Sequence, residues 1–497
     1  MQIVLRGPSA GYEAEHVARM FFPDGVLAGA DCALDDPSLD LIAAVDHAVA
    51  QIVYLRQNGD LYWKIATVDR DMPPKQREYA LCRLLYTLAC EHTGIRPPWG
   101  MMTGVRPVRI IHDMRDAGAT EEQIRQRFLE EYDCTPKRYE MALSIADLQR
   151  PVLEGSAPMD CSVYAGIPFC PTRCSYCSFV SRTVGDKSTR ALVEPYVDCL
   201  CRELTATRRV VDECGLRVRT LYIGGGTPTS LTAPQLRKLM AQMAESFPLS
   251  QLEEYTVEAG RPDCTDEEKL RILKEYGATR ISINPQTFSD EVLRNIGRRH
   301  TAQDILDCYR TARAVGHDNI NMDLIAGLPG DTVEGFRRSL ETAISLDPEN
   351  ITVHTLTLKR ASNLVVEHRA AAYADVAAML QSCDLLYQAG YRPYYLYRQK
   401  GTLQNLENIG WSKPGRECLY NIYIMEEVHT ILSAGAGGST KLVMPGQRRG
   451  KIERIFNFKY PTEYIDRFDT VLDRKKGVKR FYDACLQTNT TQTPGGM

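Results

Sequence analysis

The chain has 497 residues, of which 44% are hydrophobic and 25% are charged, a balance typical of soluble globular proteins. Sixty basic residues against sixty-three acidic ones give a formal net charge of -3, which excludes a protein that coats nucleic acid by bulk positive charge. No apolar run reaches the ~18–20 residues that a membrane helix needs, and the first residues lack the pattern of a secretory signal. We therefore expect a cytoplasmic protein with no membrane span and no nucleic-acid partner.

Residues 1–155 form the first predicted segment. Strand-like runs at 51–55 and 61–68 are mixed with helix-like stretches at 77–92 and 121–132, which predicts an α+β domain. No residue of this segment indicates a function. The Pro-, Gly- and Ser-bearing stretch at 151–160 is the candidate linker to the second segment.

From residue 162 onward, short apolar runs alternate with amphipathic stretches. Expected strands cover 162–167, 220–223, 254–259, 280–283, 319–325 and 351–356, and the helices expected after them cover 191–213, 233–246, 266–276, 289–296 with 302–314, 333–345 and 373–389. Strand-then-helix units in series predict a parallel sheet. Six units are too few to close an eight-stranded barrel, so the predicted fold class is α/β, a partial (β/α)6 barrel over residues 156–400.

The last segment, 401–497, loses this period. A glycine-rich stretch at 434–438 is followed by a basic stretch with interleaved aromatic residues at 448–480. We expect a mostly irregular or helical C-terminal domain that covers the active site on the open side of the barrel. The polar end is expected to be disordered from about residue 487.

The cysteines carry the first chemical signal. Sixteen thiols in a chain with no export signal are not expected to form a disulfide framework, and thirteen of them are scattered like small buried hydrophobic residues. Cys170, Cys174 and Cys177 instead share the loop GIPFCPTRCSYCSF. Zinc takes four ligands, and no second Cys pair or His lies nearby. Three thiolates suit a [4Fe–4S] cluster that leaves one iron open to another ligand.

Other polar motifs follow the expected strands at the same end. GGGTPT follows the second strand, Glu258 ends the third, Asn284-Pro-Gln286 follows the fourth, and Asp323 lies in the fifth. Chemistry in parallel barrels gathers at the carboxyl ends of the strands. The glycines allow a close approach of the backbone to an anion, so these motifs are expected to form one site with the three cysteines.

The segment IPFCPTRCSYCSF resembles the signature of radical S-adenosylmethionine (SAM) enzymes. YIGGGTPTSL (222–231), TVEAGRP (256–262), GATRISINPQTF (277–288), NIGRRH (295–300) and NMDLIAGLPGDT (321–332) resemble the family of oxygen-independent coproporphyrinogen III oxidases, and PPWGMMTGVRPVRI (97–110) resembles its HemZ-type branch. The resemblance implies a radical SAM barrel and an oxidoreductase of haem and porphyrin biosynthesis. Its substrate would be a porphyrinogen, coproporphyrinogen III converted to protoporphyrinogen IX, and its electron would come from a one-electron reductant of the flavodoxin or ferredoxin type.

The resemblance also implies roles for individual residues, with no catalytic side chain beyond the cluster and SAM. Cys170, Cys174 and Cys177 would bind the cluster. Gly226, Thr227 and Arg298 would contact the SAM carboxylate, Glu258 its amine, and Gln286 and Asp323 its ribose, with Tyr164 nearby. Tyr176 and Thr357 fall on positions of a second SAM. Arg173, Arg182, Lys359 and Arg360 are candidate partners of the substrate carboxylates, whereas Arg299 and His300 are expected on the surface.

Two departures from the family pattern leave alternatives open. Gly166 and Phe179 stand where the best-known oxidases have a histidine and a fourth cysteine. One alternative is a haem-binding chaperone of the same scaffold, but the stretch YNIYIM at 420–425 lacks the His, Tyr and Trp of the chaperone motif His-Asn-x-x-Tyr-Trp. The other alternative is a radical SAM enzyme that acts on haem.

Overall fold

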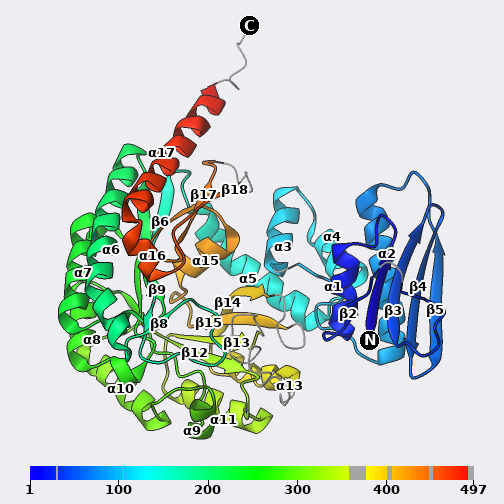
Figure 1. Cartoon of the computed structure of the whole chain (residues 1–497), viewed down its shortest axis with the longest axis horizontal. Coiled ribbons are helices and arrows are strands. Elements are labelled where there is room, and N and C mark those ends of the chain that lie inside the picture. The colour runs from blue at the N-terminus through cyan, green and yellow to red at the C-terminus, as the bar shows by residue number, and fades with distance from the viewer. Residues whose placement is uncertain (30–31, 105, 358–375, 400–405, 447–451, 491–497) are drawn as a thin grey trace. The chain divides into compact units, whose positions relative to one another are not determined.

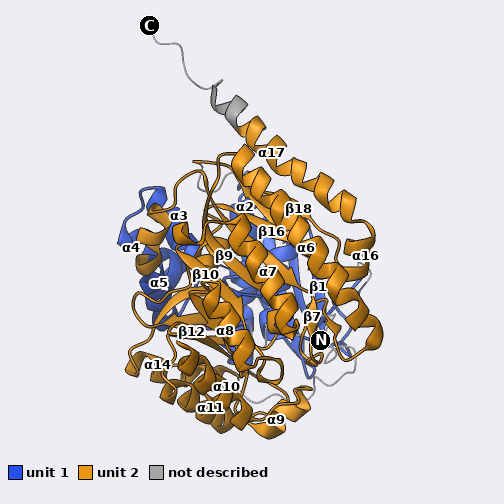
Figure 2. Cartoon of the chain, turned by 90° about the vertical axis from the view of Figure 1, so that its left-hand side faces the viewer, with its two compact units in different colours: residues 1–146, 398–406 blue, residues 147–397, 407–497 orange. Residues whose placement is uncertain are grey.

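The computed structural model of the protein describes residues 1–29, 32–104, 106–357, 376–399, 406–446 and 452–490. The chain packs as two compact units, residues 1–146 with 398–406 and residues 147–397 with 407–497 (Figure 2). The sequence predicts three segments with boundaries near 155 and 400, whereas residues 407–497 lie in the same compact unit as the predicted barrel. None of the described helices is long and apolar enough to cross a membrane.

The first unit is built on a five-stranded sheet of order β2-β1-β3-β4-β5. Its strands are β1 (Gln2–Arg6), β2 (Val26–Leu27), β3 (Leu41–His47), β4 (Ala50–Gln57) and β5 (Asp60–Thr67). Asn58 and Gly59 join β4 to β5 with φ values of 54° and 89°, the left-handed geometry that a two-residue type I′ hairpin turn requires. This turn fixes the register of β4 against the edge strand β5.

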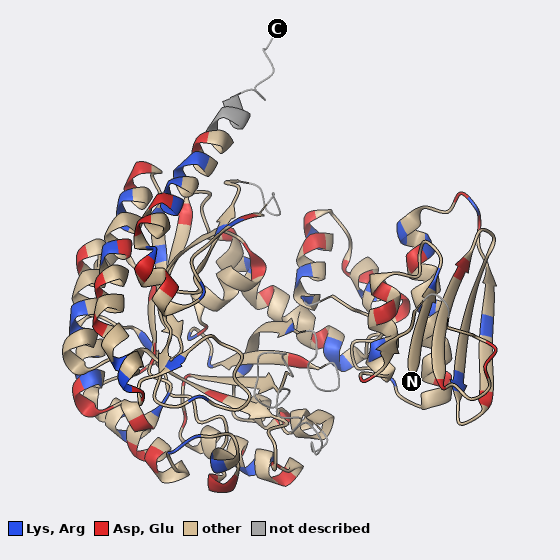
Figure 3. Ribbon diagram, in the orientation of Figure 1, with Lys and Arg blue, Asp and Glu red and all other residues tan. Residues whose placement is uncertain are grey.

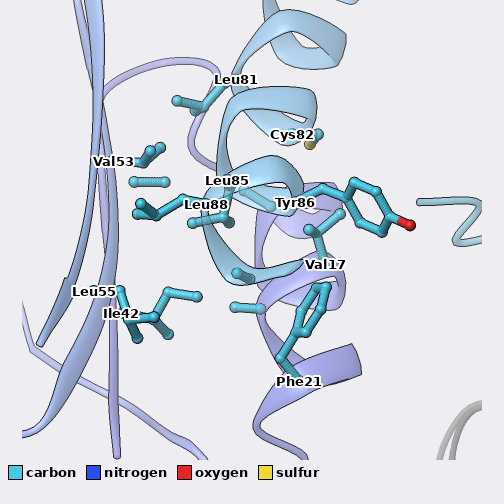
Figure 4. Packing of buried hydrophobic residues seen from close by; sticks show 14 of the residues in the cluster. Val17, Phe21, Ile42, Val53, Leu55, Leu81, Cys82, Leu85, Tyr86 and Leu88 are labelled. Atoms are coloured by element: carbon cyan, nitrogen blue, oxygen red, sulfur yellow. The ribbon is translucent and has the colours of Figure 1, made fainter. Parts of the chain in front are cut away.

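Two helices cover one face of this sheet, α1 (Tyr12–Phe21) and α2 (Pro74–Thr93). Val17, Phe21 and Leu85 from the helices pack into one buried cluster with Ile42 and Val53 from the strands (Figure 4). The other helices of this unit are α3 (Pro107–Asp116) and α4 (Glu121–Gln126), and α5 (Pro136–Glu154) begins in this unit and ends in the second. The α+β prediction is confirmed, but the predicted linker at 151–160 is shorter, because α5 continues to Glu154.

The second unit contains the predicted parallel sheet. β6 (Asp160–Ile167), β9 (Arg217–Gly225), β10 (Glu254–Glu258), β11 (Arg280–Ser282), β12 (Ile320–Ala326) and β13 (Asn350–Thr355) pair in parallel and in chain order. The helices between them are α6 (Lys187–Glu213), α7 (Ala233–Ser246), α8 (Glu267–Glu275), α9 (Asp290–Asn295), α10 (Ala302–Val315) and α11 (Val333–Ser345). After β13 the structure describes α13 (Val376–Gln381) and α14 (Asp384–Gln388) in place of one predicted helix. The partial (β/α)6 barrel is confirmed.

The two faces of this sheet differ in chemistry, as the two-residue period of a strand demands. One face is apolar and buried, with the paired Val163 and Leu221 as examples. The other face carries Tyr164 opposite Tyr222, and Glu258 opposite Ser282. The helices cover the apolar face (Figure 1), so the polar face lines the inside of the barrel.

Strands from the C-terminal part of the chain extend this sheet at both ends. β14 (Arg392–Arg398) and β15 (Glu407–Ser412) lie beyond β13, and β16 (Thr430–Ala434), β17 (Ser439–Val443) and β18 (Ile452–Phe456) lie beyond β6. The sequence predicts a mostly irregular or helical extension, and the strands β15 to β18 depart from that prediction.

The remaining helices of this part are α15 (Leu419–Glu426), α16 (Pro461–Asp466) and α17 (Phe468–Thr490). α16 and α17 pack against α6 in the outer layer (Figure 1), and α17 extends past residue 487, where the sequence predicts disorder. Lys475 on α17 lies 2.9 Å from the fully buried carboxylate of Glu203 on α6. Tyr464 and the Gly435 N–H also donate to Glu203, so one buried charge ties these helices to the barrel.

Candidate active site

The three predicted cluster cysteines lie on one loop that begins directly after β6. Cys170 ends the short strand β7 (Phe169–Cys170), which pairs with β8 (Arg182–Thr183). The N–H of Cys177 donates to the carbonyl of Cys174 at 3.1 Å, and the N–H of Ser175 donates to the carbonyl of Ile296 at 3.0 Å. The backbone of this thiol loop is therefore held both by its own turn and by the segment after α9.

The thiols influence one another. Burial raises the pKa of Cys170, and Cys174 adds to this rise against hydrogen bonds from Thr227 and Ser181. Burial likewise raises the pKa of Cys177 to about 11, with Cys174 and Cys170 acting in the same direction. Among the described residues, no three Cys, His, Asp or Glu side chains form a closed metal-ligand set. The loop thus presents neighbouring thiols that a bound cation would have to draw together and deprotonate.

The glycine turn after β9 packs directly on the thiol loop. The N–H groups of Gly226 and Thr227 donate to the carbonyls of Ile167 and Phe169 at 2.7 and 2.8 Å. The Thr227 hydroxyl lies 3.6 Å from the sulfur of Cys170, and a Cβ on Gly226 would lie 2.9 Å from the same sulfur. Only glycine fits there. Because both N–H groups already have carbonyl partners, the turn supports the thiol loop in this structure and does not present those N–H groups to an anion.

Glu258 ends β10 inside the barrel. Its Oε1 accepts a hydrogen bond from the Tyr222 hydroxyl at 2.7 Å. Burial raises the pKa of Glu258 to about 7, against the Tyr222 hydrogen bond and with the help of the nearby Asp323 charge. The ring of Tyr164 is stacked 6.0 Å from that of Tyr222, so the expected SAM neighbour Tyr164 lies beside the expected amine acceptor.

Gln286 and Asp323 meet across the next two strand ends. The Gln286 N–H donates to the Asp323 carbonyl at 2.8 Å, and Gln286 has φ of 68°, a conformation uncommon outside glycine. Burial would raise the pKa of Asp323, but His354 and a hydrogen bond from Asn321 outweigh it, so the pKa is lowered. Asp323 therefore remains ionised, beside a Glu258 whose pKa is raised to about 7.

Arg298 lies between the thiol loop and the strand ends. Its guanidinium donates to the carbonyl of Asn284 at 2.6 Å and to the Tyr176 hydroxyl at 3.3 Å. These contacts place Arg298 and Tyr176 together beside the cysteines. Thr357 follows β13 and donates to the carbonyl of Thr355 at 3.3 Å. Lys359 and Arg360 lie outside the described residues.

The sequence reasoning missed two supporting residues. Arg261, in the motif AGRPD, donates to the sulfur of Cys174 at 3.7 Å and to the carbonyl of Thr172 at 3.1 Å, and Asp263 binds its guanidinium through both carboxylate oxygens. The motif is recognisable in the sequence, but nothing in it indicates that its arginine points at a thiol. The prediction of a surface position holds for Arg299, which is exposed, whereas His300 is 4% exposed and lies 3.6 Å from Asp263.

Several buried polar atoms at these strand ends have no partner among the described residues. They are Ser175 Oγ, Ser282 Oγ, Asn284 Oδ1, Gln286 Oε1 and Arg298 Nε. A buried polar group without a hydrogen bond costs about 1–3 kcal/mol, so their gathering at one edge fits the binding of a polar ligand. The donor set, three thiols beside a carboxylate pair, fits a metal cluster and a cationic, hydroxyl-bearing cofactor.

Comparison with known proteins connects this geometry to a family. Residues 164–343 match the model of the radical SAM superfamily. Over 408 residues, which are 81% of this chain and 81% of the relative, the chain is 40% identical to the oxygen-independent coproporphyrinogen-III oxidase-like protein HemZ of Bacillus subtilis. The chain belongs to this HemZ-like family of radical SAM proteins. The cofactors of the superfamily, a [4Fe–4S] cluster and SAM, are those predicted from the thiol loop.

Other relatives carry different names. The heme chaperone HemW of Bacillus subtilis is 41% identical over 199 residues, 40% of this chain and 51% of that protein. The anaerobic coproporphyrinogen III oxidase 1 of Cereibacter sphaeroides is 34% identical over 209 residues, 42% of this chain and 45% of that protein. The solved coproporphyrinogen III oxidase HemN of Escherichia coli has a TM-score of 0.50 at 24% identity, covering 65% of this chain and 72% of that one. This last likeness concerns the fold alone.

Proposed function

We propose that this HemZ-like protein is a radical SAM oxidoreductase that decarboxylates two propionates of coproporphyrinogen III without oxygen, giving protoporphyrinogen IX. The observation that carries the radical SAM part is the meeting of the three-thiol loop with Glu258, Gln286 and Asp323 at the carboxyl edge of six parallel strands. The substrate is supported by the 40% identity to the oxidase-like relative.

In this proposal Cys170, Cys174 and Cys177 hold the cluster, and Glu258, Gln286 and Asp323 bind SAM. When bound, the cluster and SAM supply one-electron chemistry that removes a hydrogen atom from the substrate. Each propionate would give one hydrogen atom to the bound SAM-derived group, one electron to a separate one-electron acceptor, and CO2, and a vinyl group would remain. The ionised Glu258 accepts hydrogen bonds from the amine, and Asp323 and Gln286 accept them from ribose hydroxyls.

The barrel interior also excludes water from this chemistry. The ring of Tyr420, on α15, stacks 4.5 Å from that of Tyr222 and 6.4 Å from that of Tyr164. The carboxylate of Glu254, at the start of β10, accepts the N–H of Leu419 at 2.7 Å, so α15 is fixed at the amino end of the strands. A closed amino end leaves the carboxyl edge as the place where substrate enters.

A second candidate, a haem-binding chaperone, is favoured by the identity to HemW over 40% of the chain. The side chain at the position of the histidine of the chaperone motif argues against this candidate. Tyr420 occupies that position and is buried in the tyrosine stack, and burial raises its pKa well above the usual range. A neutral, enclosed phenol is not free to bind haem iron.

The test is anaerobic incubation of the cluster-replete protein with SAM, a one-electron reductant and coproporphyrinogen III. We expect the tricarboxylic intermediate and then protoporphyrinogen IX in chromatography of the oxidised porphyrins, and no product from Cys174→Ala. Cleavage of SAM without either porphyrin product would contradict the substrate, and tight haem binding without turnover would favour the carrier.

A further inference from the structure

An open cleft of about 600 Å³ lies beside the thiol loop. One wall is Thr172 and Arg173, which immediately precede Cys174. The other runs from Arg294, at the end of α9, to Thr301, just before α10. The two walls are joined by the Thr172 hydroxyl, which donates to the carbonyl of Gly297 at 3.0 Å. The cleft is therefore built partly from the cluster-binding loop itself.

The cleft is positively charged. Arg173, Arg294 and Arg299 are exposed in it, and the buried Arg298 adds a fourth guanidinium. Asp290 is its one lining carboxylate among the described residues, and that side chain already accepts the N–H of Ala302 at 2.7 Å. The side chains of Arg294 and Arg299 form no hydrogen bond or ion pair with any residue that the structure describes. Their charge is available to a partner.

A smaller acidic cleft shares Arg299 and His300 with the first. It is lined by Asp263, Asp266, Glu267, Asp304 and Asp307. Three of these carboxylates form ion pairs: Asp263 with Arg261, Glu267 with Arg271, and Asp307 with Arg310. The other two, Asp266 and Asp304, accept backbone N–H groups at the starts of α8 and α10. Acidic and basic residues are interspersed along the outer helices (Figure 3). In the first cleft, Arg294 and Arg299 carry charges with which no carboxylate of the described residues pairs.

Two arginines connect the cleft with the thiol loop through hydrogen bonds. Arg261 donates both to the carbonyl of Thr172, on the cleft wall, and to the sulfur of Cys174. Arg298 lines the cleft and donates to Tyr176 within the thiol loop. Arg261 and Arg298 thus each connect the cleft with the thiol loop, whereas Glu258 and Asp323 face the barrel interior.

We propose that this cationic cleft, defined by Arg173, Arg294 and Arg299, docks an acidic protein reductant of the flavodoxin or ferredoxin type. The docked reductant is oxidised by one electron and the cluster is reduced by one electron, with no covalent bond made or broken. This proposal rests on the proposed function only because it requires that the protein hold the cluster; it does not depend on the porphyrinogen substrate. Opposite surface charge both steers such a partner and selects against basic ones.

The test uses full-length, cluster-replete protein and a reduced flavodoxin with an acidic surface. Arg294→Glu and Arg299→Glu are compared with Arg480→Glu, which makes the same charge change at an exposed site on α17, away from α9 (Figure 1). We expect the second-order rate of flavodoxin-driven SAM cleavage to fall about tenfold or more at low salt in the two cleft variants, because steering acts on the association rate. The difference in rate between the cleft variants and Arg480→Glu should become smaller as the salt concentration rises. Reduced methyl viologen, a small cation, should drive all four proteins without loss.

Equal flavodoxin-driven rates in the cleft variants and in Arg480→Glu would overturn the docking proposal. Failure of the wild-type protein to cleave SAM with methyl viologen would instead count against the proposed function. In that case docking is measured without turnover, by calorimetry of the binding of oxidised flavodoxin. We expect flavodoxin to bind more weakly to the two cleft variants than to Arg480→Glu. Binding of inorganic phosphate in the cleft with no binding of flavodoxin would also overturn the proposal.

Discussion

Lowering the pH from 8 to 6 should weaken SAM binding through a single side chain, Glu258. Burial raises the pKa of this carboxyl to about 7, and the charge of Asp323 acts in the same direction. The Tyr222 hydroxyl, the Gly225 N–H and His354 act against the rise. Tyr164 and Tyr420 also interact with this carboxyl, and burial keeps both phenols neutral by raising their pKa values.

The magnitude comes from the ionised fraction. With a pKa of about 7, that fraction falls from about nine tenths at pH 8 to about one tenth at pH 6. Only the ionised form accepts a charge-assisted hydrogen bond from the amine. The dissociation constant of SAM should therefore rise about tenfold, or about 1.4 kcal/mol. Asp323 does not add to the change, because its pKa is lowered and it stays ionised throughout this range.

The assay is anaerobic equilibrium dialysis of labelled SAM against cluster-replete protein at each pH, with the iron content measured in parallel. Glu258→Gln should bind more weakly at pH 8 and show no pH dependence. Because the pKa of Glu258 in the fold lies above its ordinary value of 4.5, the protonated side chain stabilises the fold at low pH, and this contribution is lost as the pH rises from about 4.5 to about 7. The glutamine variant should therefore not melt at a lower temperature at pH 8. A wild-type affinity that is constant from pH 6 to 8, or an equal slope in the variant, would refute this reasoning.

Three further outcomes are expected. Cys174→Ala should lose most of the iron after anaerobic reconstitution, because a missing thiolate opens a second iron to solvent, whereas Cys161→Ala should keep it; iron analysis of both checks this. Asp323→Ala should retain the iron but bind SAM less tightly by about 0.5–1.5 kcal/mol, the value of one hydrogen bond, in the same dialysis assay. Lys475→Met should lower the free energy of unfolding by about 3–5 kcal/mol, because it strands the buried charge of Glu203; denaturant titration measures this, and an unchanged midpoint would contradict it.

The parallel core of the fold was accessible from sequence because each strand–helix unit is encoded locally. The predicted strand at 319–325 and the observed β12 differ by one residue at each end, since an apolar run bounded by turn residues marks its own limits. The same logic placed Glu258, Gln286 and Asp323 at one edge. Their protonation states were not accessible, because the pKa of Glu258 depends on burial and on Asp323, which is distant in sequence.

The parts that sequence reasoning missed depend on long-range contacts. β16 is a short strand whose partner β6 is separated from it by almost the whole barrel sequence. Arg261 touches Cys174 only because two loops from different strands meet. His300 stands in a charged, surface-like stretch and is buried nonetheless. Residue patterns report the face that an element buries, but not which distant side chain meets it there.

The pairing of β16 with β6 has a consequence for the order in which the protein is made. β6 and the thiol loop leave the ribosome long before β16 and Lys475 do. Until those last residues emerge, the nascent chain has an unpaired strand edge next to the cluster-binding loop and an unneutralised carboxylate at Glu203. Open edges of this kind promote association between incomplete chains. A chain stopped before residue 430 should therefore be a substrate for chaperones and proteases, and not a smaller working enzyme.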